Sequence, residues 1–248
     1  MSNLKDVLKN VKYLLLDMDG TVYLGGKLIG NMDKTLDKIR KAGKKIIYLT
    51  NNSSKSVESY YKKLTDMNLF RLGDEVKTSG LAAIDFLKAN RKGKTVRLLG
   101  TTSLKEEFAK NGINVTEEGV ADICVLAYDT ESTYVKLCKF TDNLWENAEY
   151  IVTHPDINCP SENKPLPDVG SFIELIKTST GRVPDVIIGK PYKTFGDWLM
   201  REYNAAPEEF MMVGDRLYTD IAFGVNCGFH SLFVLSGEGT EDMVDKSD

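Results

Sequence analysis

Short apolar runs alternate along the chain with segments whose apolar residues recur every three or four positions. Residues 11–16, 45–49 and 210–213 (VKYLLL, KIIYL and FMMV) are typical of strands buried inside a parallel sheet. Residues 31–42 and 193–203 have the spacing of amphipathic helices. Further strands are expected at 95–99, 122–127, 150–153, 186–188 and 231–235, and further helices at 55–67, 81–89, 103–110, 133–146, 171–177 and 219–226. This alternation predicts an α/β fold with parallel sheets.

The first apolar run ends in two carboxylates that lie two residues apart. Asp17 and Asp19 belong to the sequence DMDGT, which begins where the strand ends. Ligands of parallel sheets collect at the carboxyl ends of the strands. Two close carboxylates are costly to desolvate unless a cation such as Mg²⁺ joins them. The alternative is an ordinary Asp-Gly turn after a strand.

Three more polar clusters follow buried strands. Thr50 follows the run KIIYL and begins the segment TNNSS, which is also a good turn and helix cap. Lys190 lies between a glycine and a proline after a short apolar run, although a lone lysine is most often an exposed surface residue. Asp215 and Asp220 belong to GDRLYTD after the run FMMV; the alternative is a turn and a helix-end residue.

The four clusters, in this order, resemble the four motifs of the haloacid dehalogenase (HAD) superfamily. The segment TVYLG after DMDGT is similar to the NagD-like and p-nitrophenylphosphatase-type phosphatases. The resemblance implies a Rossmann-like core, a parallel sheet with helices on both faces, and an inserted α/β cap of type C2. Because the stretch between Thr50 and Lys190 far exceeds one crossover, we expect core segments at 1–80 and 183–248 and the cap at 81–182.

The resemblance also implies a mechanism and a cofactor. Asp17 would be the nucleophile, and Asp19 would protonate the leaving group and then activate water. Thr50 and Lys190 would hold the transferring phosphoryl group. Mg²⁺ would be bound by Asp17, by the backbone carbonyl of Asp19 and by Asp215.

Further site residues are expected around these. Asp220 would support the metal site, and Gly20, Asn51 and Asn52 would contact the phosphorylated substrate. Within the cap, His154 and Asp156 follow a strand and precede a proline-rich loop. Substrate contact is one interpretation of these two residues, and a structural role in the loop is the other.

The implied activity is hydrolysis of a small phosphorylated metabolite, such as a sugar phosphate or a nucleotide. A phosphotransferase or phosphomutase is the alternative within enzymes, although the mutases of this superfamily are capped between the first two motifs. A phosphoryl-accepting regulatory module without turnover is the alternative from another class; receiver-like domains lack the second aspartate. The sequence does not identify the substrate.

The composition indicates which classes of partner and which compartment to expect. The net charge of −4 provides no basic footprint for nucleic acid. No apolar run reaches membrane-spanning length and no signal peptide is evident, which favours a cytoplasmic protein.

The four cysteines form no CxxC pair and are expected to be reduced, and two histidines give little support for a histidine-rich zinc site. The resemblance allows a homo-oligomer formed through the cap, and the acidic tail from Gly237 is expected to be poorly ordered.

Overall fold

The computed structural model describes residues 4–160 and 164–245, and the chain divides into two compact units. The first unit consists of Met1–Thr50, Val57–Lys77 and Lys190–Asp248. The second consists of Asn51–Ser56 and Thr78–Gly189. The motif spacing predicts an inserted domain at 81–182. In the structure the second unit also includes Val186–Ile187, because this strand pairs in parallel with Glu149–Val152.

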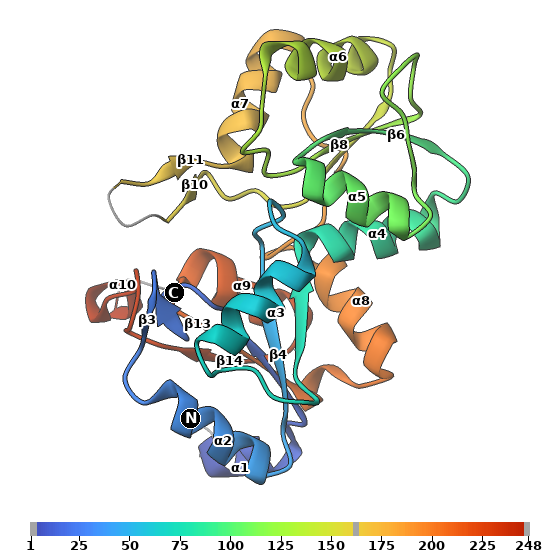
Figure 1. Cartoon of the computed structure of the whole chain (residues 1–248). Helices are drawn as coiled ribbons and strands as arrows, with labels where there is room; N and C mark the ends of the chain where they lie inside the picture. The colour runs from blue at the N-terminus through green and yellow to red at the C-terminus, as the bar shows by residue number, and fades with distance from the viewer. Residues whose placement is uncertain (1–3, 161–163, 246–248) are drawn as a thin grey trace. The chain divides into compact units, whose positions relative to one another are not determined.

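The first unit is built on a five-stranded sheet with the order β14-β13-β1-β4-β5 (Figure 1). The strands are β1 (Tyr13–Leu16), β4 (Lys45–Thr50), β5 (Glu75–Thr78), β13 (Phe210–Gly214) and β14 (His230–Phe233). β1 pairs in parallel with both β4 and β13, and β13 pairs in parallel with β14. β1 is therefore a central strand, and three of its four residues are buried, as its apolar run predicts.

Helices and short connections complete this unit. They are α1 (Leu4–Asn10), α2 (Met32–Lys41), α3 (Val57–Asp66), α8 (Lys193–Tyr203), α9 (Ala222–Cys227), α10 (Glu241–Asp245), the 3₁₀ turn η1 (Pro207–Glu209), the π-helical turn η2 (Leu217–Ile221), and the antiparallel hairpin β2 (Tyr23–Leu24) and β3 (Lys27–Leu28). Aromatic packing joins strands and helices. The ring of Phe210 stacks 4.8 Å from that of Phe229 and 4.9 Å from that of Tyr13.

The second unit has a parallel sheet of its own with the order β12-β9-β8-β6-β7. Its elements are α4 (Ser79–Asn90), β6 (Thr95–Leu99), α5 (Thr102–Lys110), β7 (Asn114–Val115), β8 (Ile123–Leu126), α6 (Tyr134–Trp145), β9 (Glu149–Val152), the antiparallel hairpin β10 (Asn158–Cys159) and β11 (Leu166–Pro167), α7 (Val169–Thr180) and β12 (Val186–Ile187). In Figure 1, α4 and α5 lie on one side of this sheet and α6 on the other.

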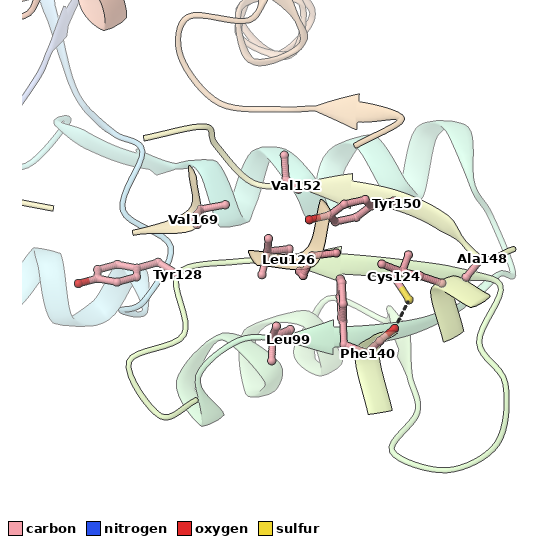
Figure 2. Packing of buried hydrophobic residues seen from close by; sticks show 11 residues of the cluster. Leu99, Cys124, Leu126, Tyr128, Phe140, Ala148, Tyr150, Val152 and Val169 are labelled. Atoms are coloured by element: carbon pink, nitrogen blue, oxygen red, sulfur yellow. Dashed lines mark hydrogen bonds between the residues drawn. The ribbon is translucent and has the colours of Figure 1, made fainter. Parts of the chain in front are cut away.

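One apolar cluster holds α6 and α7 against this sheet (Figure 2). Cys124 and Leu126 of β8 pack with Phe140 of α6 and Val169 of α7, and all four are fully buried or nearly so. The Cys124 thiol donates to the Phe140 carbonyl oxygen at 3.7 Å. Burial of this kind stabilises the unit by roughly 1.5–3 kcal/mol per large side chain. The second unit thus has a hydrophobic core of its own.

The predicted α/β architecture with parallel sheets is confirmed, but several local expectations differ from the structure. The tail from Gly237 is expected to be poorly ordered, whereas Glu238 is hydrogen bonded and Glu241–Asp245 forms α10; residues 246–248 of this tail lie outside the described residues. The helix expected at 219–226 begins as the π-helical turn η2. None of the four cysteines takes part in a disulfide in the structure. No helix within residues 4–160 and 164–245 is long and apolar enough to cross a membrane.

Candidate active site

The register of the first sheet brings the first, second and fourth sequence clusters to one edge. Leu16 at the end of β1 pairs with Tyr48 of β4 on one side and with Val213 of β13 on the other. The three strands therefore end at about the same level, with Asp17, Thr50 and Asp215 at their carboxyl ends. This is the edge at which parallel sheets bind ligands.

A buried lysine joins two aspartates at this edge. The Lys190 ammonium donates to Asp17 Oδ1 at 2.7 Å and to Asp220 Oδ1 at 2.6 Å. Lys190 and Asp220 are each 1% exposed, so this is not the solvated surface lysine that the sequence left as an alternative. The short π-helical turn η2 directs Asp220 inward, and Asp220 also accepts from the Arg216 N–H at 3.2 Å.

The charges in this cluster shift one another's pKa values. Burial raises the pKa of Asp17 to about 8, and the nearby carboxylates of Asp220 and Asp215 add to this, while Lys190 opposes it. Burial alone would lower the pKa of Lys190, but Asp17 and Asp220 outweigh it and raise this pKa. Lys190 contacts two of the carboxyl groups, Asp17 and Asp220, and a third, Asp215, lies close to both. A cation bound here would favour the ionised form of all three.

Asp215 lies beside the turn that follows Asp17. The Thr21 hydroxyl donates to Asp215 Oδ1 at 3.3 Å, and the Glu238 N–H donates to Oδ2 at 2.7 Å. Gly20 has a φ of +88°, and a Cβ at this position would lie only 2.7 Å from Asp215 Cγ. Glycine is therefore required here both by the left-handed backbone and by close packing.

Three carboxylates fit a hard divalent cation. Carboxylate oxygens of Asp17, Asp215 and Asp220 all lie within 4.8 Å of one another. Mg²⁺ prefers oxygen ligands and is usually bound through a few carboxylates together with waters and phosphate oxygens. The Asp19 carboxylate is not part of this group of three.

Asp19 instead presents its side chain at the surface. The residue is exposed, and its Oδ1 accepts from the Gly25 N–H at 3.4 Å. The intervening turn is tight, because the N–H groups of Val22 and Tyr23 both donate to the Met18 carbonyl oxygen at 2.9 and 3.2 Å. A carboxyl group that is held on such a turn and open to solvent can exchange protons with a substrate or with water.

The other predicted substrate residues form a group within the second unit. Asn51 Nδ2 donates to both carboxylate oxygens of Asp156, at 3.2 and 3.1 Å. The fully buried ring of His154 lies 3.6 Å from Asp156 through Nδ1 and 3.6 Å from Asp168 through Nε2. This geometry favours a role for His154 in fixing the loop over direct substrate contact.

The amide of Asn52 is also engaged in local structure. Its Oδ1 accepts from the Ser54 N–H at 2.9 Å and from the Ser54 hydroxyl at 2.8 Å. Thr50 is the last residue of β4 and is buried. Two neighbours of Asp215 are not predicted from the sequence: Thr21 and the segment Ser236–Glu238. The glycine-rich sequence SGEG soon after a strand was the signal for the latter.

Comparison with protein families gives two matches. Residues 14–114 match a family described as haloacid dehalogenase-like hydrolase, and residues 187–248 match one described as HAD-hydrolase-like. Among curated proteins, an acid sugar phosphatase of Staphylococcus haemolyticus is 32% identical over 241 residues, which covers 97% of this chain and 91% of that protein.

Two similar solved structures are also phosphatases. A 4-nitrophenylphosphatase from Thermotoga maritima superposes with a TM-score of 0.93 and 38% identity, covering 98% of this chain and 92% of that one. A glycerol phosphate phosphatase from Mycobacterium tuberculosis, in complex with magnesium, has a TM-score of 0.89 and 26% identity, covering 98% of this chain and 73% of that one. The likeness extends over nearly the whole chain in each case.

Proposed function

Because the chain belongs to the haloacid dehalogenase-like hydrolases and is a phosphatase, we propose that Asp17 transfers the phosphoryl group of a small metabolite to water. The observation that carries this proposal is the cluster of the partly buried Asp17 with the buried Lys190, Asp215 and Asp220 at the strand ends. The relatives act, by name, on sugar, glycerol and nitrophenyl phosphates. We therefore assign the substrate to small phosphomonoesters, with a sugar or polyol phosphate as the first candidate.

In the first step the Asp17 carboxylate attacks phosphorus. An Asp17 oxygen forms the new bond while the bond from phosphorus to the leaving oxygen breaks, and the Asp19 carboxyl proton moves to that oxygen. In the second step the Asp19 carboxylate takes a proton from water. The water oxygen then bonds to phosphorus, and the bond to Asp17 breaks, which releases inorganic phosphate.

The remaining residues orient the nucleophile and offset the negative charge of the site and of the substrate. Lys190 fixes the Asp17 carboxylate through its 2.7 Å hydrogen bond, and its charge offsets the repulsion between this carboxylate and an anionic substrate. Asp17, Asp215 and the Asp19 carbonyl would bind Mg²⁺, and Asp220 would anchor Lys190 beside them. When bound, the ion would supply Lewis-acid stabilisation of the phosphoryl oxygens. We propose that Thr50 contacts the phosphoryl oxygens. Contacts with the substrate are assigned to Asn51, Asn52 and Asp156.

Phosphate release from a panel of phosphomonoesters tests this function. We expect release from sugar, glycerol and p-nitrophenyl phosphates, loss of release on chelation, and recovery with Mg²⁺. Asp215→Ala should remove activity because one of the three clustered carboxylates is gone. Activity that persists in chelator would contradict the metal requirement. Transfer to a second organic acceptor instead of water would favour the phosphotransferase alternative.

The role of Asp19 predicts a dependence on the leaving group. We expect Asp19→Asn to lower kcat/KM about 10²–10⁴-fold for alkyl phosphates and far less for p-nitrophenyl phosphate, whose leaving group needs no proton. kcat/KM is the informative constant, because it excludes the hydrolysis of the phosphoenzyme that both substrates share. Equal losses of kcat/KM on both substrates would show that Asp19 is not the general acid.

A further inference from the structure

After β14 the chain returns to the cluster of Asp17, Asp215 and Asp220. Ser236 donates its hydroxyl to the Gly20 carbonyl oxygen at 2.7 Å, and the Glu238 N–H donates to Asp215 Oδ2 at 2.7 Å. Gly20 and Asp215 follow the strands β1 and β13, respectively. The segment Ser236–Glu238, here called the strap, is thus hydrogen bonded to both of the turns that carry the acidic residues.

The middle of the strap has no room for a side chain. A Cβ on Gly237 would overlap Asp215 Oδ2, and it would lie 2.6 Å from Asp215 Cγ and 2.7 Å from Gly20 Cα. Two of these neighbours are atoms of the Asp215 carboxylate and the third is backbone, so none can move away as the end of a flexible side chain could. Glycine is required at this position by contact with the site.

The strap is also held from the side by the turn of the fourth motif. Glu238 Oε1 accepts from the Tyr218 hydroxyl at 2.7 Å, and Glu238 Oε2 lies 2.9 Å from Arg216 Nε. Arg216 directly follows Asp215, so these contacts tie the strap to the segment that it supports. The Glu238 backbone and side chain therefore act on the same turn.

We propose that the strap is a positioning element that fixes the Asp215 carboxylate for the divalent cation. Thr21 occupies Oδ1 and the Glu238 N–H occupies Oδ2, so the carboxylate is held in one orientation while each oxygen keeps a lone pair for a metal. Outer hydrogen bonds of this kind commonly change metal affinity 10–100-fold. The proposal rests on the proposed function, because it takes Asp215 to be a metal ligand.

Magnesium binding to Gly237→Ala, measured by titration calorimetry, tests the strap. We expect Mg²⁺ to bind about 10–100-fold more weakly than to the wild type. The matched control is Gly26→Ala, because a Cβ on Gly26 meets nothing within 4 Å. Its Mg²⁺ affinity should equal that of the wild type. A purely structural role would lower the unfolding temperature of the metal-free protein, whereas positioning lowers Mg²⁺ affinity and leaves kcat recoverable at saturating Mg²⁺.

A second variant keeps the test decisive if Gly237→Ala does not fold. Glu238→Ala keeps the N–H to Asp215 but loses the contacts with Tyr218 and Arg216, so it should weaken Mg²⁺ binding by a smaller factor. The positioning role of the strap would be overturned if both variants bound Mg²⁺ with wild-type affinity. If Gly237→Ala does not fold, wild-type Mg²⁺ affinity in Glu238→Ala alone would overturn it. Absence of Mg²⁺ binding in the wild type, or unchanged binding in Asp215→Ala, would instead overturn the proposed metal role.

Discussion

Asp17→Asn is expected to abolish phosphatase turnover and leave the fold intact. Loss of a nucleophile that acts together with its partners lowers kcat by at least about 10⁴-fold. The amide has nearly the same shape as the carboxylate, and Lys190 keeps its 2.6 Å contact with Asp220. Phosphate release and thermal unfolding, measured on the same preparation, separate loss of chemistry from loss of structure.

A surface aspartate provides the control for this variant. Asp66→Asn makes the same chemical change at the end of α3, where the Asp66 side chain is 61% exposed and forms an ion pair with Lys62. We expect wild-type activity from it, because exposed ion pairs contribute little. If Asp17→Asn retained a substantial share of wild-type turnover, Asp17 could not be the nucleophile.

Lys190→Met is expected to have the largest effect on stability. The metal-free variant should lose about 3–5 kcal/mol of unfolding free energy, because the buried Asp220 and the partly buried Asp17 lose the ammonium that contacts both of them. Mg²⁺ should recover much of this loss, since a divalent cation neutralises the same carboxylates. Catalysis should remain very low even with Mg²⁺, because the charge that faces the phosphoryl group is missing.

Denaturant unfolding with and without Mg²⁺ measures this difference. Lys62→Met is the control, because the Lys62 side chain is 77% exposed in its ion pair and its loss should leave the stability nearly unchanged. The account of the buried cluster fails if Lys190→Met is as stable as Lys62→Met. It also fails if Mg²⁺ stabilises Lys190→Met no more than it stabilises the wild type.

The central strands could be predicted because their chemistry changes abruptly. β1, β4 and β13 are apolar runs that end in polar residues, and the structure places Asp17, Thr50 and Asp215 at those ends. Lys190 could be recognised only from its GKP context, since no property of a lone lysine predicts burial. Its burial depends on Asp17 and Asp220, which are distant in the sequence.

Other features depend on contacts that no local pattern records. The strand β5 (EVKT) was missed because it is rich in charge, yet Lys77 is buried beside Glu202 and Glu75. The tail from Gly237 has few large apolar residues, but the hydrogen bond from the Glu238 N–H to Asp215 fixes its beginning. His154 follows a strand as expected, and its burial between two aspartates could not be read from the sequence.

Trapping of the phosphoenzyme tests the central claim most directly. The enzyme is mixed with a phosphomonoester and Mg²⁺, quenched in acid within one turnover, digested and analysed by mass spectrometry. The account predicts that one phosphoryl group is found on Asp17 and that borohydride converts this acyl phosphate to homoserine at the same position. A phosphoryl group on any other residue, or phosphate release without an adduct at any time within the first turnover, would contradict it.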